Sequence, residues 1–300
     1  MEAAVIRRLG FRVRRKLKTF GAYLPSTPPD RDEFLREINI DNPGQLLDKF
    51  PMLFDGVEHP ATCKKLLREF PVECERLEQV ARNASQHKFD LLGSGQVDLG
   101  SVIEWSLDFK SGKRWSKGDY RLQKLVDLHD RSDVKVPWEL SRCNHFVQMA
   151  LAFLITGENE FPRKFENQVT SWCEQNEFEQ SINWTCAMET AFRCINWLAA
   201  YKMFSNQWEF LDDFKSRLIV ELFKGGKHIW NNLENAGYGF NTNHYLSDLV
   251  GLLFLGELFK ETRLGSEWRK FAFSELEKEI TAFLQNRRNE PIAMPGKIKP

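Results

Sequence analysis

Apolar residues recur at helical spacing over the second half of the chain. From about residue 141 onward they return every three or four positions, and the strict alternation typical of strands is scarce. No Asn-Gly or Asp-Gly pair joins two alternating segments, as a β-hairpin would require. We therefore predict a mainly α-helical chain, with helices at residues 142–156, 162–175, 185–204, 209–233, 244–260 and 267–286.

Short polar turns, such as residues 156–159, separate neighbouring helices and make them antiparallel. Antiparallel pairs that recur along a chain suit a toroid of helical hairpins or an α-solenoid better than a four-helix bundle. Neither the tetratricopeptide nor the ankyrin consensus recurs at a fixed period. The pattern thus predicts an all-α fold built of antiparallel helical hairpins.

The first half of the chain is less regular. Residues 24–90 hold shorter helical stretches interrupted by prolines, and residues 91–133 form a long connection rich in glycine. We expect large side chains to hold this connection on the domain, with Trp105, Phe109 and Trp115 as the candidates. The helical period is lost after Gln285, which predicts an irregular tail at residues 287–300.

Residues 1–23 combine a cluster of lysines and arginines with a stripe of apolar residues. This basic amphipathic segment is either a surface helix packed on the domain or an arm that docks on a membrane surface or a partner. It contains no uninterrupted apolar run, so we find no secretory signal and expect a cytoplasmic protein. The longest apolar stretch, residues 245–259, carries two acidic residues and is shorter than the roughly 20 apolar residues of a membrane span.

The composition excludes several classes of protein. The chain has 300 residues, of which 42% are hydrophobic, and its 42 basic side chains balance 42 acidic ones, which argues against a nucleic-acid partner. Six cysteines lie apart without a CxxC pair, and the six histidines show no HExxH or similar spacing. We therefore predict no metal, no cofactor and no disulfide framework.

A first polar cluster lies on the predicted helix that starts at Thr185. On a helical wheel, Glu189, Arg193 and Asn196 lie opposite its apolar face, with Trp197 at the edge of the polar stripe. The stripe is either an ordinary solvated face or the wall of a polar cleft. The second alternative is typical of a sugar site, where a flat indole lies beside charged hydrogen-bonding groups.

A second cluster precedes the helix at residues 142–156. Glu139 and Arg142 are three residues apart, which favours either an ion pair or, together with Trp138, contact with a ligand. Ser141 is expected to cap the helix. His145 is expected to be a hydrogen-bonded core histidine.

The third cluster is the pair Asn243-His244, which leads directly into an almost wholly apolar helix. Such a helix belongs in the middle of a domain, so His244 at its start is expected at a central opening. Asp248, one turn further on, is placed to orient the imidazole. The alternative is structural, with Asn243 as the helix cap and His244 as a core residue.

Three stretches of the sequence match the motifs of a known family, in the same order along the chain. They read W-x-x-D-F-K-S-G at residues 105–112, D-V-K-V-P-W-E-L-S-R at residues 133–142 and N-W-x-x-x-M-E from residue 183. Together with Asn243-His244, they make the chain resemble the N-terminal domain of heparinase II/III-like polysaccharide lyases from about residue 85 to 280. The resemblance implies an incomplete α/α toroid, which we assign to residues 24–286, and β-elimination of uronic-acid polysaccharides without a metal in the lyase step.

The resemblance also implies roles for individual residues. Removing the C5 proton beside a carboxylate leaves a poorly stabilised carbanion, so an amide or imidazole donor must hold that carboxylate. Asn243 and His244 match the positions that carry this role. An acidic polysaccharide or oligosaccharide would then bind in a cleft lined by Trp138, Glu139, Arg142, Glu189, Arg193 and Trp197.

Proton transfer in the family uses a tyrosine beyond the Asn-His pair and a histidine from a following β-sandwich domain. This sequence has no tyrosine after Tyr245 and no histidine after His244. We therefore expect a truncated chain without the β-sandwich domain. Because the family's lyases are exported, a periplasmic location is the alternative to the cytoplasm.

Three functions stay open from the sequence. The first is the N-terminal half of a uronate-specific polysaccharide lyase. The second is a catalytically inactive glycan-binding or assembly module of surface-polysaccharide metabolism. The third is a glycoside hydrolase that uses Glu139 and Glu189 as its two carboxylates.

Overall fold

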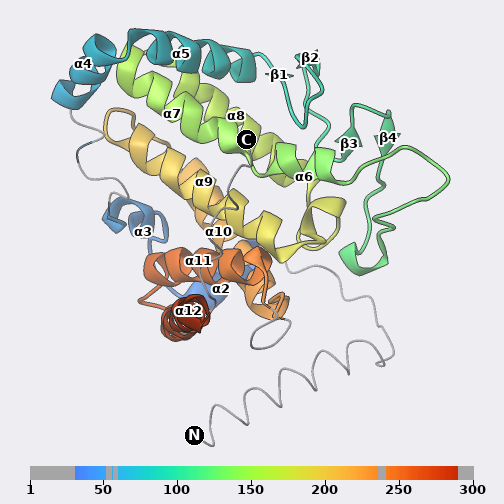
Figure 1. Cartoon of the computed structure of the whole chain (residues 1–300). Helices are drawn as coiled ribbons and strands as arrows, with labels where there is room; N and C mark the ends of the chain where they lie inside the picture. Colours follow the sequence, from blue (N-terminus) through green and yellow to red (C-terminus); the bar gives the residue numbers. More distant parts are fainter. Residues whose placement is uncertain (1–30, 52–55, 57–59, 236–240, 290–300) are drawn as a thin grey trace, which may run out of the picture.

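Three antiparallel helical hairpins form most of the fold (Figure 1). The computed structural model describes residues 31–51, 56, 60–235 and 241–289. All six helices predicted from the periodicity are present, with ends that differ by up to four residues from the expected ones. Their bounds are α7 (Asn144–Thr156), α8 (Glu160–Gln175), α9 (Ala187–Ser205), α10 (Asp212–Asn231), α11 (Asn243–Leu258) and α12 (Arg263–Asn289).

The hairpins stack side by side in two layers. Helix α9 packs between α7 and α11, while α8 packs on α7, α10 on α9 and α12 on α11 (Figure 1). Every second helix of the chain therefore lies in the same layer. This arrangement confirms the all-α class and the incomplete α/α toroid.

Four helices precede the hairpins in the described chain, and the first three are short, as the prolines predicted. They are α2 (Arg31–Ile38), α3 (Gly44–Lys49), α4 (Pro60–Glu69) and α5 (Pro71–Ser85). Pro71 is the first residue of α5, where its missing N–H costs no helical hydrogen bond. Helix α5 covers α7, and α2 and α3 pack on α10.

The chain after α5 contains two strand pairs that the sequence pattern did not predict. The antiparallel pairs are β1 (Lys88–Phe89) with β2 (Val97–Asp98) and β3 (Leu107–Asp108) with β4 (Lys113–Arg114), followed by the 3₁₀ helix η1 (Tyr120–Leu122). Two residues per strand are too few to produce a recognisable alternation. The connection then leads into α6 (Lys135–Ser141), and a second 3₁₀ helix, η2 (Ile182–Trp184), precedes α9.

Two buried side chains hold this connection. Trp105 has no exposed surface, and its indole donates a 3.3 Å hydrogen bond to Ser171 Oγ of α8. Asp108 is 1% exposed and accepts the backbone N–H groups of Lys110 and Asp133 at 2.9 and 3.0 Å. The anchoring by Trp105 is therefore confirmed, and Asp108 fixes the point from which the chain enters α6.

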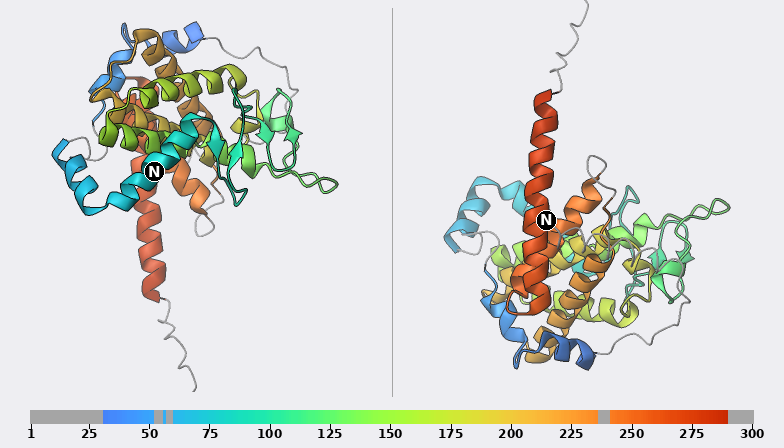
Figure 2. Two further views of the ribbon diagram at one scale, coloured as in Figure 1. Left: turned by 90° about the horizontal axis from the view of Figure 1, so that it is seen from above. Right: turned by 90° about the horizontal axis from the view of Figure 1, so that it is seen from below.

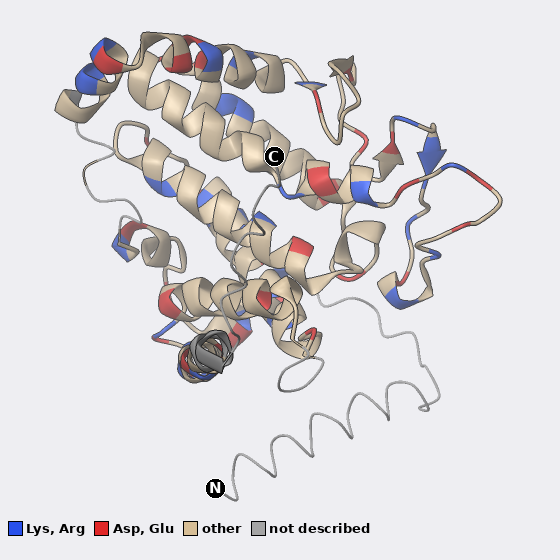
Figure 3. Ribbon diagram, in the orientation of Figure 1, with Lys and Arg blue, Asp and Glu red and all other residues tan. Residues whose placement is uncertain are grey.

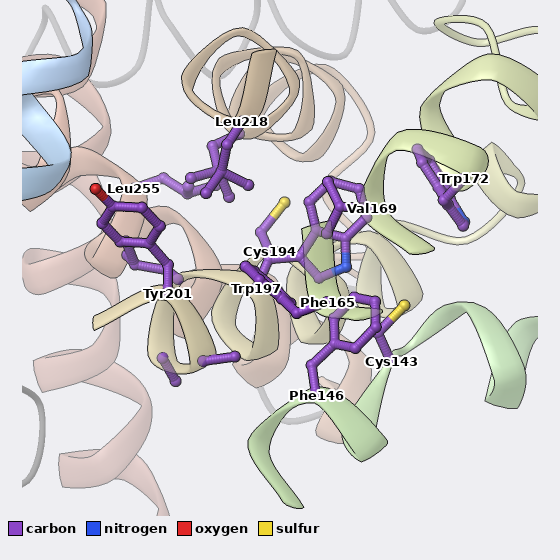
Figure 4. Packing of buried hydrophobic residues seen from close by; sticks show 14 of the residues in the cluster. Cys143, Phe146, Phe165, Val169, Trp172, Cys194, Trp197, Tyr201, Leu218 and Leu255 are labelled. Atoms are coloured by element: carbon purple, nitrogen blue, oxygen red, sulfur yellow. The ribbon is translucent and has the colours of Figure 1, made fainter. Parts of the chain in front are cut away.

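The core between the layers is rich in aromatic side chains. Phe146 of α7, Phe165 and Trp172 of α8 and Trp197 of α9 lie together (Figure 4), and the Trp172 and Trp197 rings meet edge to face with centroids 5.3 Å apart. Helix α11 approaches its neighbours closely, since a Cβ on Gly251 would lie 2.7 Å from the Ala191 Cβ of α9. The apolar stretch predicted as a buried helix is thus packed between α9 and α12.

Helix α12 extends beyond the body of the fold (Figure 2). It ends at Asn289, so residues 287–289, which were predicted to begin the irregular tail, belong to the helix. The basic segment at residues 1–23 and the rest of the tail, residues 290–300, lie outside the described residues. Charged residues of both signs are distributed over the ribbon (Figure 3), and none of the described helices is long and apolar enough to cross a membrane.

Candidate functional site

Arg142 is the centre of a polar cluster at the N-terminal end of α9. Its guanidinium binds both carboxylate oxygens of Glu189, with Nε–Oε2 at 2.5 Å and Nη2–Oε1 at 2.8 Å. A third contact joins Nη1 to Glu139 Oε2 at 2.7 Å. The hydrogen bonds to Glu189 raise the pKa of Arg142 above its ordinary value. The ion pair predicted between Glu139 and Arg142 is therefore present, and Glu189 from another helix joins it.

Local backbone geometry places Arg142 at a corner of the chain. Helix α6 ends at Ser141, and Cys143 then adopts a left-handed conformation (φ 57°) before α7 begins. The prediction that Ser141 caps the following helix is wrong, because Ser141 belongs to α6. Its hydroxyl instead accepts a 3.2 Å hydrogen bond from the Trp172 indole.

A second cluster lies at the start of α11 and joins three segments of the chain. The Nδ1 atom of His244 lies 2.7 Å from Glu234 Oε2, and the Cys186 thiol donates to Glu234 Oε1 at 3.3 Å. Burial, followed by the charge of Glu234, raises the pKa of Cys186. Cys186 also interacts electrostatically with Arg142 and Glu189, so the two clusters are neighbours.

Two expectations about the start of α11 need correction. Thr242, not Asn243, is the N-cap, since its hydroxyl accepts the His244 N–H at 3.2 Å. Asp248 does not orient the His244 ring. It accepts the backbone N–H of Glu234 at 2.8 Å, and Glu234 is the residue that holds the imidazole.

Arg193 and Trp197 cannot contact a ligand, because both side chains are 2% exposed. The Arg193 guanidinium lies against two indoles, 4.1 Å from the Trp172 centroid and 5.0 Å from that of Trp184, and burial lowers its pKa. Trp197 belongs to the aromatic core (Figure 4). Their burial contradicts the prediction that Arg193 and Trp197 line a glycan-binding cleft.

The other predicted residues have mixed surroundings. Trp138 is half-buried, and its indole donates to Ile182 O at 3.0 Å and Thr185 Oγ1 at 3.2 Å. The polar stripe of α9 is not a solvated face, since Glu189 is also 2% exposed. His145 is a core histidine as expected, with Nε2 2.8 Å from Gln168 Oε1.

Cys186 and Glu234 are the members of the site that we did not predict. Glu234 follows α10 and is 48 residues from Cys186 and 10 from His244, so no local spacing relates the three residues. Their ligand atoms lie within 4.8 Å of one another, which makes them a group that could hold a metal ion. Two cavities, one between α4, α5 and α7 and one in the β4–α6 connection, lie elsewhere.

Comparison with known proteins gives the relatives of this chain. The chain is 24% identical to the heparin-sulfate lyase of Pedobacter heparinus over 233 residues, and 21% identical to that of Bacteroides stercoris over 175 residues. These alignments cover 76% and 51% of the chain, but only 30% and 25% of the two relatives. The chain thus spans less than a third of their length.

Solved structures show the same fold. The crystal structure of a heparan sulfate lyase HepC mutant from Pedobacter heparinus matches 89% of the chain and 36% of its own, with a TM-score of 0.55 and 20% identity. The heparinase III-BT4657 gene product matches 85% of the chain and 40% of its own, with a TM-score of 0.54 and 18% identity. A family model described as Heparinase II/III N-terminus matches residues 63–286, and the chain therefore belongs to this family.

Proposed function

We propose that this chain is the glycan-binding domain of a polysaccharide lyase that cleaves uronic-acid-containing polysaccharide by β-elimination. The observation that carries the proposal is the first turn of α11, where the exposed Asn243 is followed by His244, whose ring is held by Glu234. The relatives named as heparin-sulfate lyases support the substrate class.

The chemistry of the first turn suits a carboxylate. Because Glu234 accepts at Nδ1, the other ring nitrogen of His244 is available to a ligand, and the imidazolium form would carry positive charge. The Asn243 amide adds a donor, and the N-terminus of α11 adds the positive end of a helix dipole. These groups would neutralise the uronate when negative charge accumulates on it during removal of the C5 proton.

In this proposal Arg142 positions the side chains of Glu139 and Glu189 rather than the glycan. It already binds the carboxylates of Glu139 and Glu189, so its charge is offset within the protein. The same contacts argue against the glycoside hydrolase alternative. That mechanism needs one protonated carboxyl and one free carboxylate, whereas both candidates here accept hydrogen bonds from a single guanidinium.

Proton transfer is the part of the reaction for which we find no suitable tyrosine after the Asn-His pair in this sequence. Tyr245 follows the Asn-His pair, but its side chain is fully buried and its hydroxyl donates to Glu275 Oε2 at 3.1 Å. Burial also raises the pKa of Tyr245, so its hydroxyl stays protonated at neutral pH and is not available as a base. The proposal therefore assigns the acid and base to groups outside this chain, in a β-sandwich domain such as the resemblance implies.

Binding and cleavage can be measured separately. We expect the purified chain to bind a uronic-acid oligosaccharide prepared from heparan sulfate in calorimetry. Asn243→Ser and His244→Gln should each weaken binding at least tenfold with an unchanged melting temperature, whereas the control His129→Gln, on an exposed loop, should bind like the wild type. Equal affinity in all four proteins would refute the proposal.

The same protein should form at most a trace of unsaturated product. General acid–base catalysis typically contributes about 10² to 10⁴-fold to a rate, and the proposal assigns this contribution to groups outside the chain. Product is measured by the ultraviolet absorbance of the new double bond. A rate within tenfold of a complete lyase would contradict the assignment of proton transfer to another domain, while an inactive binding module would give no product with any added domain.

A further inference from the structure

The cluster of Cys186, Glu234 and His244 has a second capacity that does not depend on glycan binding. We propose that Cys186 Sγ, a Glu234 carboxylate oxygen and His244 Nδ1 bind one Zn²⁺ ion. The three atoms lie within 4.8 Å of one another. A thiolate, an imidazole and a carboxylate are the three ligand types that zinc uses in proteins.

The distances in the cluster are close to those of a zinc site. Bonds of roughly 2.0 to 2.3 Å place neighbouring ligand atoms of a tetrahedral zinc about 3.4 to 3.6 Å apart. Glu234 Oε1 lies 3.3 Å from the Cys186 sulfur, and the other carboxylate oxygen, Oε2, lies 2.7 Å from His244 Nδ1. To bind one ion through a single oxygen, the Glu234 carboxylate must rotate, and its contact with His244 must open by less than 1 Å. Both side chains are partly exposed, which leaves room for this adjustment.

Hydrogen bonds outside the cluster hold the central ligand. Glu234 Oε1 also accepts the backbone N–H of Met188 at 3.2 Å, and the Glu234 N–H donates to Asp248 Oδ2 at 2.8 Å. Cys186 precedes the first residue of α9 and His244 is in the first turn of α11, so two packed helices fix the other ligands. Such outer contacts orient ligands and increase metal affinity.

The site would have an open fourth position. The side chains of His244 and Glu234 are 37% and 32% exposed, so water or an oxygen ligand can reach a bound ion. Three protein ligands with an open position are typical of zinc sites that bind or activate a ligand rather than only support the fold. On binding, the thiol releases its proton, and the neutral imidazole moves its proton from Nδ1 to Nε2.

Cobalt(II) gives a direct test, because it replaces zinc and its bond to a thiolate produces a near-ultraviolet charge-transfer band. The full chain, freed of metal with a chelator and kept reduced, should take up one equivalent of Co²⁺ with this band. Zn²⁺ should displace it, whereas Mg²⁺ should not, because hard cations prefer oxygen ligands. No uptake, or uptake without the band, would overturn the proposal.

Variants identify the ligands. Cys186→Ser should remove the band, and Cys186→Ser, Glu234→Gln and His244→Gln should each weaken Zn²⁺ binding by more than the roughly 10- to 100-fold typical of losing an outer contact. Cys173→Ser and His129→Gln are matched controls from outside the cluster and should bind zinc like the wild type. A band that survives Cys186→Ser, or equal zinc affinity in the ligand and control variants, would show that the metal binds elsewhere.

Discussion

Arg142 donates side-chain hydrogen bonds to the buried carboxylate of Glu189. The Glu189 side chain is 3% exposed, and both carboxylate oxygens bind the Arg142 guanidinium. A buried carboxylate is costly when its partner is removed, but removing both members of a buried pair is often neutral. The Arg142–Glu189 pair is therefore expected to stabilise the fold only as a pair.

This expectation gives a first prediction. Arg142→Met should lower the free energy of unfolding by about 3 to 5 kcal/mol, because it leaves a buried charge without compensation. The double variant Arg142→Met/Glu189→Leu should recover at least half of that loss. Urea unfolding of the wild type, Arg142→Met, Glu189→Leu and the double variant measures the coupling energy between the two residues. If the double variant loses the sum of the two single losses, the expectation is wrong.

His145 gives a second prediction at the residue scale. Burial lowers its pKa to about 4, and the ring donates to Gln168 rather than to a charged group. In the unfolded chain the pKa is near 6.5, so between these values the unfolded state binds more protons and stability rises with pH. The contribution is complete above about pH 6.5 and is lost as the pH falls towards 4.

The size of this effect can be measured. A shift of this size corresponds to about 3 kcal/mol in total. His145→Gln keeps a donor for Gln168 but cannot titrate, so its stability should fall less steeply between pH 6.5 and pH 5 than that of the wild type. Parallel curves for the two proteins would show that His145 does not titrate as its burial implies.

Residue spacing predicted local contacts but not burial. The Glu139–Arg142 pair follows from spacing along one segment. The burial of Arg193 does not, because a helical wheel cannot show what covers a face. The face of α9 that carries Arg193 is covered by Trp172 from α8 and Trp184 from η2.

At the scale of elements, periodicity identified the six helices from α7 to α12 but not their end signals, and it gave no bounds for the 15-residue helix α5. The start of α11 is an example, since both Thr242 and Asn243 are good capping residues and only the structure distinguishes them. The β-strand pairs were missed because they are two residues long. Their positions depend on buried anchors such as Asp108, whose partner Asp133 is distant in sequence.

The cap of α11 provides a third prediction. Thr242→Ala removes the oxygen that accepts the His244 N–H and should lower the free energy of unfolding by about 0.5 to 2 kcal/mol. Thr242→Ser keeps this oxygen and should be close to the wild type, as should Asn243→Ser. Thermal unfolding distinguishes these variants. If Asn243→Ser is the destabilising change, the cap is Asn243 after all.

At the scale of the whole molecule, the two-layer stack of hairpins brings distant segments together at one end of α9. Cys186, Glu234 and His244 meet there although the pattern of cysteines and histidines predicted no metal site. Such a site depends on where the segment after α10 lies against α9 and α11, and no sequence spacing encodes that position. The toroid itself was predictable from the resemblance, because periodicity alone left an α-solenoid open.

The central claim is that an acidic glycan contacts the first turn of α11, and nuclear magnetic resonance can test it at His244. The chain would be labelled with ¹⁵N at its six histidines, and the His244 imidazole signals identified by their loss in His244→Gln. During titration with a uronic-acid hexasaccharide, these signals should shift with the occupancy of the site, while those of His87 and His129 stay in place. Saturating binding that leaves the His244 signals unmoved would contradict the account.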